Sequence, residues 1–408
     1  MKSNRMSGFD KAELTGELLE RYDRQLRLEG WDQRKLMDSE VIIVGVGAIG
    51  CELAKNLTLM GVGKIVLVDN DVIELSNLNR QMLFTDSDIG KPKAEMAAEK
   101  LKAMNPWVRV ESYYRDVREF DLEFFKDSNV IVSCLDNWPT RRWLNSLAVE
   151  LTKPFVDTAM DGMYANLQIV IPGKTACLEC HGEELIPKEV QLAECTLRRR
   201  KPEDLLKDLR SEGIDLSLET VKKLFDHGIK TIFDIKYSQA DILEKLDDDL
   251  RNVVIDLQEK LKPKMPALQS IASTIAGIAS TEIIKILHGE SLGEILNGLL
   301  VYDGFNSRFT IVELERREDC FVCGDYVMEK GVEFKVGFEE TVMELKKRIA
   351  ERFGFPDPEL LYKRWKLSDE KKVSELGIRS GDVIYVETSR RYMPLPLRIE
   401  VEEKQVND

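Results

Sequence analysis

Four of the seven cysteines form two Cys-x-x-Cys pairs, Cys177 with Cys180 and Cys320 with Cys323. Two such pairs can supply four thiolates to one tetrahedral Zn²⁺, and a site with four protein ligands is closed and structural. In a chain that begins without an apolar signal segment, this spacing favours a metal or reactive thiols over disulfides. Two separate redox or buried pairs are the alternative.

Three glycines, Gly45, Gly47 and Gly50, form a Gly-x-Gly-x-x-Gly loop between an apolar run and a helix-length segment. Small residues there let backbone N–H groups approach a phosphate at the positive end of a helix. Asp69 ends the next apolar run, where an acidic residue binds a ribose hydroxyl. This pattern fits an adenylating enzyme and a dehydrogenase equally. A glycine turn that serves only close helix packing is a third interpretation.

The elements that must hold these residues alternate between strand and helix. Residues 40–71 contain an apolar β-branched run, the glycine loop, a helix-length segment and a second apolar run, which together predict a βαβ unit. The runs 129–137 and 153–160, separated by a helix-like segment, continue the alternation. The sequence therefore predicts an α/β fold with a doubly wound, mainly parallel, Rossmann-like sheet.

Later segments complete this domain and add two others. An apolar helix over 265–287 returns the chain to the core, and the runs 299–305 and 308–314 predict a closing hairpin. Between them lies a charged segment with helical spacing, and after them a strand, a capped helix and a second strand. The expected boundaries are 1–180 with 264–330 for the nucleotide-binding domain, 181–263 for a helical insertion, 331–390 for a small C-terminal domain and 391–408 for a charged tail.

The composition excludes some classes of function. Lysine and arginine total 59 against 73 aspartates and glutamates, so the net charge of −14 opposes binding to nucleic acid phosphates. No run of eighteen apolar residues is present, and the first forty residues lack the apolar core of a signal peptide. We therefore expect a cytoplasmic protein that binds neither nucleic acid nor membranes.

Several motifs in one order resemble the adenylation domain of ubiquitin-activating enzymes and of their bacterial relatives that activate sulfur-carrier proteins. The resemblance extends from about Leu18 to Cys323. Besides the glycine loop and the cysteine pairs, it rests on RYDRQ (21–25), Asp69 and Asp71, SNLNRQ (76–81), GKPKA (90–94) and CLDN (134–137).

The resemblance implies a role for each matching residue. Together with the glycine loop, the expected ATP-binding residues are Asp69 for the ribose, Asn77, Arg80 and Lys93 for the triphosphate, and Asp71 and Gln81 beside them. Asp136 matches the Mg²⁺ ligand, and many members hold Zn²⁺ with four cysteines placed as here. Arg24 matches an arginine that, in homodimeric members, reaches the active site of the other subunit. Since this chain retains that arginine, a homodimer is the expected assembly, and a heterodimer with a separate partner chain is the alternative.

Cys195 stands in AECTLRRRKPE, where four basic residues from Arg198 to Lys201 should lower the thiol pKa. The Cys-Thr step followed by Pro202 resembles the catalytic-cysteine motif of ubiquitin-type activating enzymes. The alternative is an ordinary small apolar residue on a basic helix. Cys51, on the helix after the glycine loop, and Cys134, at a strand end, have structural explanations, which leaves Cys195 as the expected nucleophile.

Residues 331–389 resemble the ubiquitin-fold, or β-grasp, domain that recruits a conjugating enzyme in eukaryotic relatives. A β-grasp domain that only stabilises a dimer is the alternative. The expected function is adenylation of a ubiquitin-like protein at its C-terminal glycine, thioester formation on Cys195, and transfer to a conjugating enzyme. A sulfur-carrier adenylyltransferase for molybdopterin or thiamine synthesis is the second candidate. A dehydrogenase shares only the glycine loop, and an inactive adapter would have lost Lys93 or Asp136.

Overall fold

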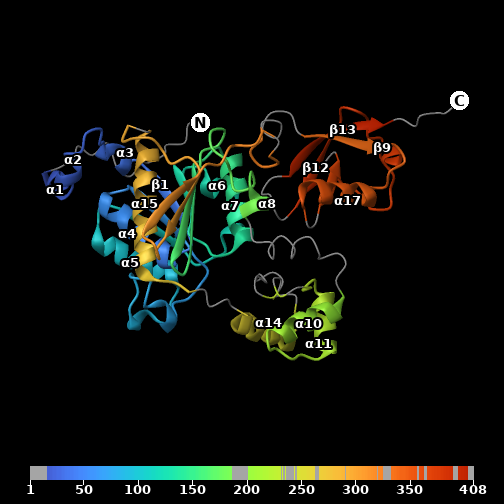
Figure 1. Cartoon of the computed structure of the whole chain (residues 1–408), viewed down its shortest axis with the longest axis horizontal. Helices are drawn as coiled ribbons and strands as arrows, with labels where there is room; N and C mark the ends of the chain where they lie inside the picture. Colours follow the sequence, from blue (N-terminus) through green and yellow to red (C-terminus); the bar gives the residue numbers. More distant parts are fainter. Residues whose placement is uncertain are drawn as a thin grey trace, which may run out of the picture. The chain divides into compact units, whose positions relative to one another are not determined.

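A computed structural model describes residues 16–185, 201–230, 232, 235, 243, 246–261, 266–289, 291–318, 320–324, 332–355, 358–362, 365–388 and 394–402. Cys195 and Arg198–Arg200 lie outside the described residues. The chain forms two compact units (Figure 1). The first comprises 1–136, 151–175 and 267–314, and the second comprises 137–150, 176–266 and 315–408.

An eight-stranded sheet organises the first unit, in the order β3-β2-β1-β4-β5-β6-β7-β8. Its strands are β1 (Glu40–Val44), β2 (Lys64–Val68), β3 (Arg109–Tyr113), β4 (Val130–Ser133), β5 (Phe155–Asp161), β6 (Tyr164–Val170), β7 (Leu299–Asp303) and β8 (Arg308–Val312). The pairs from β3 through β5 are parallel, and those from β5 to β8 are antiparallel. The predicted parallel sheet and closing hairpin are confirmed.

The strand order brings three distant segments to one edge of this sheet. Val44, the last residue of β1, pairs with Val68 on one side and with Ser133 on the other. The glycine loop, Asp69 and Cys134–Asp136 follow these residues directly. In an open parallel sheet, ligands bind at the carboxyl ends of the strands, at the point where the strand order reverses.

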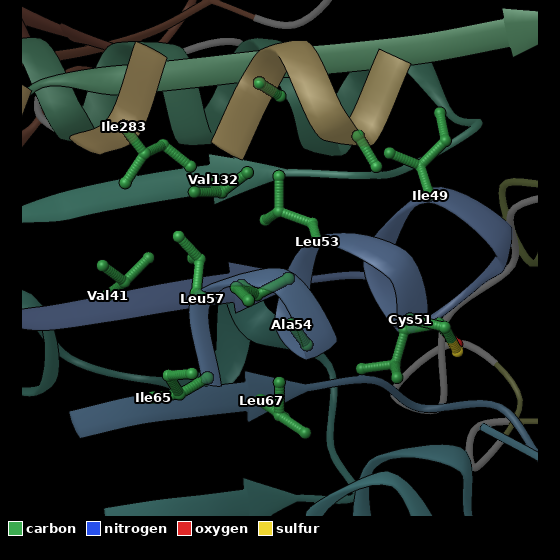
Figure 2. Packing of buried hydrophobic residues seen from close by; sticks show 14 of the residues in the cluster. Val41, Ile49, Cys51, Leu53, Ala54, Leu57, Ile65, Leu67, Val132 and Ile283 are labelled. Atoms are coloured by element: carbon green, nitrogen blue, oxygen red, sulfur yellow. The ribbon is translucent and has the colours of Figure 1, made fainter. Parts of the chain in front are cut away.

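Three helices cover one face of the parallel strands: α4 (Ala48–Met60), α5 (Lys93–Met104) and α15 (Gln269–His288) (Figure 1). Figure 2 shows Leu53 and Leu57 of α4 in the cluster that also holds Val41 of β1 and Ile283 of α15. By length and composition α15 could cross a membrane. Its apolar residues instead lie in this core, with Ile275 and Ile283 fully buried, so α15 is a core helix.

Short helices complete the first unit. They are α1 (Gly16–Arg21), α2 (Asp23–Leu26), α3 (Gln33–Met37) and α6 (Leu122–Phe125), with 3₁₀ turns at Leu75–Asn77, Asp86–Asp88 and Val117–Glu119.

The second unit contains α7 (Trp138–Glu150), α8 (Gly182–Leu185) and the described part of the insertion. That part is helical, as predicted, with α10 (Pro202–Ser211), α11 (Leu218–Asp226) and α14 (Asp248–Leu261). Leu209, Val221 and Val254 centre a small core of their own, because the apolar positions of each helix fall on one face.

The C-terminal part forms a five-stranded sheet in the order β11-β10-β12-β13-β9. Its elements are β9 (Val332–Gly337), α17 (Val342–Phe353), β10 (Glu359–Tyr362), β11 (Trp365–Lys366), a 3₁₀ turn (Val373–Leu376), β12 (Val383–Glu387) and β13 (Leu395–Glu402). The expectation of a charged tail over 391–408 is wrong for β13. Leu395, Leu397 and Ile399 alternate with less buried residues and lie in the core that also contains residues of α17, while β13 pairs in parallel with β9.

Candidate nucleotide site and cysteine cluster

The glycine loop is tight enough that its glycines cannot be replaced without movement. Gly45 has φ +91°, and a Cβ there would lie 2.7 Å from the carbonyl oxygen of Cys134. A Cβ on Gly50 would lie 2.0 Å from the carbonyl oxygen of Gly45. Gly47 is the N-cap of α4. The loop therefore packs against both β4 and the first turn of α4, with the positive end of that helix at the sheet edge.

Asp69 joins this loop to the segment after β2. Its Oδ2 accepts a hydrogen bond from the Val46 N–H at 2.6 Å, and its Oδ1 accepts one from the Asp71 N–H at 2.7 Å. Burial raises the pKa of Asp69 to about 6, although the ammonium of Lys93 favours the ionised form. An ionised carboxylate retains further lone pairs that can accept hydrogen bonds from ribose hydroxyls.

Lys93 is the buried cation of the site. Its side chain is 9% exposed, and its Nζ lies 2.8 Å from Oδ2 of Asp71, whose side chain is 57% exposed. Burial alone would lower the pKa of Lys93, but the carboxylates of Asp69 and Asp71 outweigh burial and raise it. The lysine is therefore held charged, beside an aspartate that is itself accessible.

Asn77, Arg80 and Gln81 of the SNLNRQ segment each make a different kind of contact. The Oδ1 of Asn77 accepts from the Glu74 N–H at 3.0 Å, so Asn77 closes its own turn. Arg80 donates to the carbonyl of Ser76 at 2.6 Å. Gln81 is 4% exposed and lies next to the glycine loop, since a Cβ on Gly47 would be 4.0 Å from its Nε2.

The buried Oε1 of Gln81 accepts no hydrogen bond within the described part of the chain. An unsatisfied buried acceptor costs roughly 1–3 kcal/mol. A hydroxyl or amino group of a nucleotide bound at the glycine loop would supply the missing donor. The residues present therefore fit a nucleotide.

Asp136 is exposed two residues after Cys134, on the same edge as the glycine loop. Among the residues that the structure describes, no ion pair or hydrogen bond engages its carboxylate. A free carboxylate beside a triphosphate site suits Mg²⁺, which binds proteins through one or two carboxylates and otherwise through phosphates and water.

We expect Asp69 to make nucleoside binding sensitive to pH. Its pKa of about 6 lies above the ordinary value of 3.8, so the carboxylate is ionised above pH 6 and becomes protonated as the pH falls through 6. We expect the affinity for adenosine, which has no phosphate to titrate, to be constant above pH 7 and to fall below pH 6 by up to about tenfold per pH unit. Calorimetric titration from pH 5 to 8 measures this, with Asp69→Asn as a weak and pH-independent control. Constant affinity of the unaltered protein down to pH 5 would contradict it.

Arg24 is not brought to the glycine loop of its own chain. Its side chain is 93% exposed and its nearest partner is Asp23 at 3.8 Å. The next residue, Gln25, donates to the carbonyl of Met60 at 2.8 Å, which is the last residue of α4. Since Gly47 caps the other end of this 13-residue helix, about 20 Å separates the two ends.

The four cysteines of the two pairs come together in the second unit. Their Sγ atoms all lie within 4.8 Å of one another, with 3.7 Å between Cys177 and Cys320 and 3.4 Å between Cys180 and Cys323. A disulfide needs about 2.05 Å, whereas a tetrahedral site with bonds of about 2.3 Å separates its sulfur atoms by about 3.8 Å. The cluster could hold Zn²⁺, and the alternative of two separate pairs is wrong.

A buried ion pair supports this cluster, and no sequence motif indicated it. Arg142 of α7 binds both carboxylate oxygens of Glu179, which lies inside the first Cys-x-x-Cys pair, with 2.7 Å between Nη2 and Oε2. Asn145, one turn along α7, accepts from the Leu178 N–H at 3.1 Å. The Arg317 N–H reaches Sγ of Cys180 at 3.5 Å, which favours a thiolate there.

Cys51 and Cys134 are poor nucleophiles. Burial raises the pKa of the Cys134 thiol to about 12 and that of Cys51 higher still. The Sγ of Cys51 lies 3.4 Å from the carbonyl oxygen of Val46, and the hydroxyl of Thr158 donates to Sγ of Cys134 at 3.4 Å. Both thiols therefore serve packing around the glycine loop.

Residues 22–322 match the model of the ThiF family, and residues 327–391 match that of the Ubiquitin family. The chain therefore belongs to the ThiF family, and its resemblance to the ubiquitin-activating enzymes is confirmed. It is 29% identical to the NEDD8-activating enzyme E1 catalytic subunit of Dictyostelium discoideum, over 86% of this chain and 85% of that protein. It is 30% identical to the corresponding subunit of Drosophila melanogaster, over 70% and 66%.

Solved structures support the fold. A crystal structure of E. coli MccB with MccA-N7isoASN has a TM-score of 0.52 at 20% identity, covering 75% of each chain. At this identity the likeness extends to the fold alone.

Proposed function

We propose that this enzyme uses ATP to adenylate the C-terminal glycine of a ubiquitin-like protein and then takes the acyl group onto Cys195. The observation that carries the proposal is the arrangement at the sheet edge, where Asp69, Lys93 and Gln81 converge on the glycine loop. The two relatives named above are catalytic subunits of NEDD8-activating enzymes, and the ubiquitin-like C-terminal domain accords with such a role.

The first step joins a carboxylate oxygen of the terminal glycine to the α-phosphorus of ATP and breaks the bond to pyrophosphate. Negative charge grows on the phosphoryl oxygens and the leaving group, and preorganised cations stabilise such charge strongly in a water-poor site. Lys93 is such a cation, since it is buried and kept charged by two carboxylates. Asp69 orients the ribose, and Asp136 would hold Mg²⁺, which neutralises phosphate charge when bound.

In the second step the Cys195 thiolate attacks the acyl carbon, AMP leaves, and a thioester forms. An acyl adenylate has a good leaving group, so the four basic residues that follow Cys195 can suffice to activate the thiol. Cys51 and Cys134 do not suit this role, because both thiols pack around the glycine loop and burial raises their pKa values.

The proposed assembly is a homodimer in which Arg24 of each chain completes the nucleotide site of the other. The position of Arg24 supports this, because the far end of α4 separates it from its own glycine loop while its side chain is free to reach a second copy. A cytoplasmic location is also part of the proposal, supported by six described cysteines that form no disulfide.

The ubiquitin-like domain is proposed to recruit the conjugating enzyme. Its core is self-contained, with Phe334, Leu345, Ile384 and Leu397 all buried within it. Deleting the chain after Lys330 removes this domain whole, including β13. We expect thioester formation to persist and transfer to a conjugating enzyme to fall at least tenfold, measured by single-turnover chase of a preformed thioester. Equal transfer by both forms would contradict the recruiting role.

The direct test mixes the enzyme and ATP with a panel of ubiquitin-like proteins that end in Gly-Gly, comprising NEDD8, SUMO and those of the source genome. ATP–pyrophosphate exchange reports the adenylate, and a thiol-sensitive adduct reports the thioester. Exchange without an adduct would favour the sulfur-carrier adenylyltransferase, which stops at the adenylate. Exchange with no member of the panel would contradict the proposal.

A further inference from the structure

The segment that carries Arg24 is fastened to the first unit through the side chain of Gln33, which is 1% exposed. The Nε2 of Gln33 donates to the carbonyl of Met60 at 3.0 Å, at the C-terminal end of α4. Its Oε1 accepts from Nε2 of Gln25 at 2.5 Å and from Nε1 of Trp31 at 3.1 Å. One buried carboxamide therefore joins the end of α4 to the residue next to Arg24.

Flanking contacts fix the same segment on both sides. Before Arg24, the hydroxyl of the buried Tyr22 accepts from Nδ2 of Asn105 at 2.9 Å. After it, the Asp32 N–H donates to Nε2 of the buried His288 at 3.0 Å, and the ring of His288 lies 5.0 Å from that of Trp31.

Gly61, just after α4, provides the room for these contacts. It has φ +84°, and a Cβ there would lie 2.4 Å from the Tyr22 hydroxyl and 2.7 Å from Nε2 of Gln33. The backbone around Arg24 is thus tied at three points, while Arg24 itself faces outward.

We propose that Gln33 is a positioning residue for Arg24: through Gln25 and Met60 it sets where the arginine stands for use by a second copy of this chain. The inference rests on the proposed function of Arg24 in the partner site. An outward arginine can stabilise developing phosphoryl charge only if it arrives within a fraction of an ångström of its place, since misplacement by about 1 Å can cost on the order of 100-fold in rate. A buried amide with both polar atoms engaged supplies that restraint better than an exposed helix of four residues.

Gln33→Leu removes the restraint and leaves the nucleotide site of the same chain unaltered. We expect kcat for ATP–pyrophosphate exchange to fall on the order of 10- to 100-fold with little change in the KM for ATP, because the arginine acts in the transition state. The substrate in this assay is the ubiquitin-like protein, from the panel described above, that the unaltered full-length enzyme adenylates best. Ile65→Val, a core change in β2 away from this network, is the matched control: it lowers Tm and keeps the rate.

The decisive experiment pairs two impaired chains. Gln33→Leu and Lys93→Ala chains carry different tags, are co-expressed, and are purified through both tags as mixed dimers. The Gln33→Leu chain then has an intact nucleotide site and receives Arg24 from the Lys93→Ala chain, so one site of two works and about half of the unaltered activity returns. A defect in folding of the Gln33→Leu chain would not be repaired in this way.

A second mixed dimer, of Arg24→Ala and Lys93→Ala chains, separates the positioning role of Gln33 from the use of Arg24 across the dimer. If this pair recovers activity and the Gln33→Leu pair does not, Gln33 has no positioning role and the proposed use of Arg24 stands. If the Arg24→Ala pair fails to recover, Arg24 does not act across the dimer and the inference falls with it. Should Gln33→Leu yield no folded chain, Gln25→Met replaces it, because this substitution breaks the same hydrogen bonds at a partly exposed residue. Recovery of activity in the mixed dimer of Gln25→Met and Lys93→Ala chains then tests the inference in the same way.

Discussion

Cys195→Ala is expected to keep ATP–pyrophosphate exchange and to lose the thiol-sensitive adduct, whereas Lys93→Ala is expected to lose both. Exchange requires only the adenylate, which we propose forms at the sheet edge. The adduct requires a nucleophilic sulfur. Lys93→Ala removes the buried ammonium beside Asp69 and Asp71, and loss of one such preorganised charge costs about 10²–10³-fold in rate.

The matched control is Lys91→Ala, two residues away. Lys91 is half exposed and lies 3.7 Å from Asp88, so its removal should leave exchange within about twofold, as expected for an exposed ion pair. If Cys195→Ala still forms the adduct, another residue is the nucleophile. If Lys93→Ala retains full exchange, the proposed phosphate contact is wrong.

Loss of one cysteine of the cluster should have the largest effect on stability. We expect elemental mass spectrometry to find one Zn²⁺ per chain in the unaltered protein and less than about 0.1 Zn²⁺ per chain after Cys180→Ser. The same substitution should lower the Tm of the second unit by about 10 °C or more, since structural zinc contributes directly to folding. Glu179 lies between Cys177 and Cys180 and pairs with Arg142 in the interior, so a loosened cluster would also disturb this buried ion pair.

Cys51→Ala is the control for a buried cysteine outside the cluster. It should keep its zinc, because Cys51 contacts the glycine loop and none of the four clustered thiols. Full zinc content and an unchanged calorimetric transition in Cys180→Ser would show that the cluster does not bind the metal.

The sequence predicted the parallel sheet because its signals are local. The β-branched run 40–44, the glycine turn and the helix after it each occupy adjacent residues, and their order dictates the parallel pairing. The cysteine cluster was also predictable, since four thiols have few other uses in such spacing.

Other features depend on partners that are distant in the chain and carry no pattern. Gln33 meets Met60, and Arg142 meets Glu179, only because the fold brings them together. The strand 395–402 alternates as a strand should, but it was missed because the run is short and lies in a segment rich in charge. Its identity as a strand comes from pairing with β9 and β12. The order of residues in the sequence also does not reveal that Arg24 lies near the C-terminal end of α4, away from the glycine loop.

The burial of Cys51 and Cys134 has a practical consequence. Burial keeps both thiols protonated at neutral pH, and a bound metal would shield four others. Under the role proposed for Cys195, a gentle alkylating reagent would therefore label one sulfur per polypeptide. Stoichiometric labelling could then count functional enzyme molecules in a preparation, and an electrophile linked to a carrier's terminal residues could trap the enzyme selectively from a mixture of proteins.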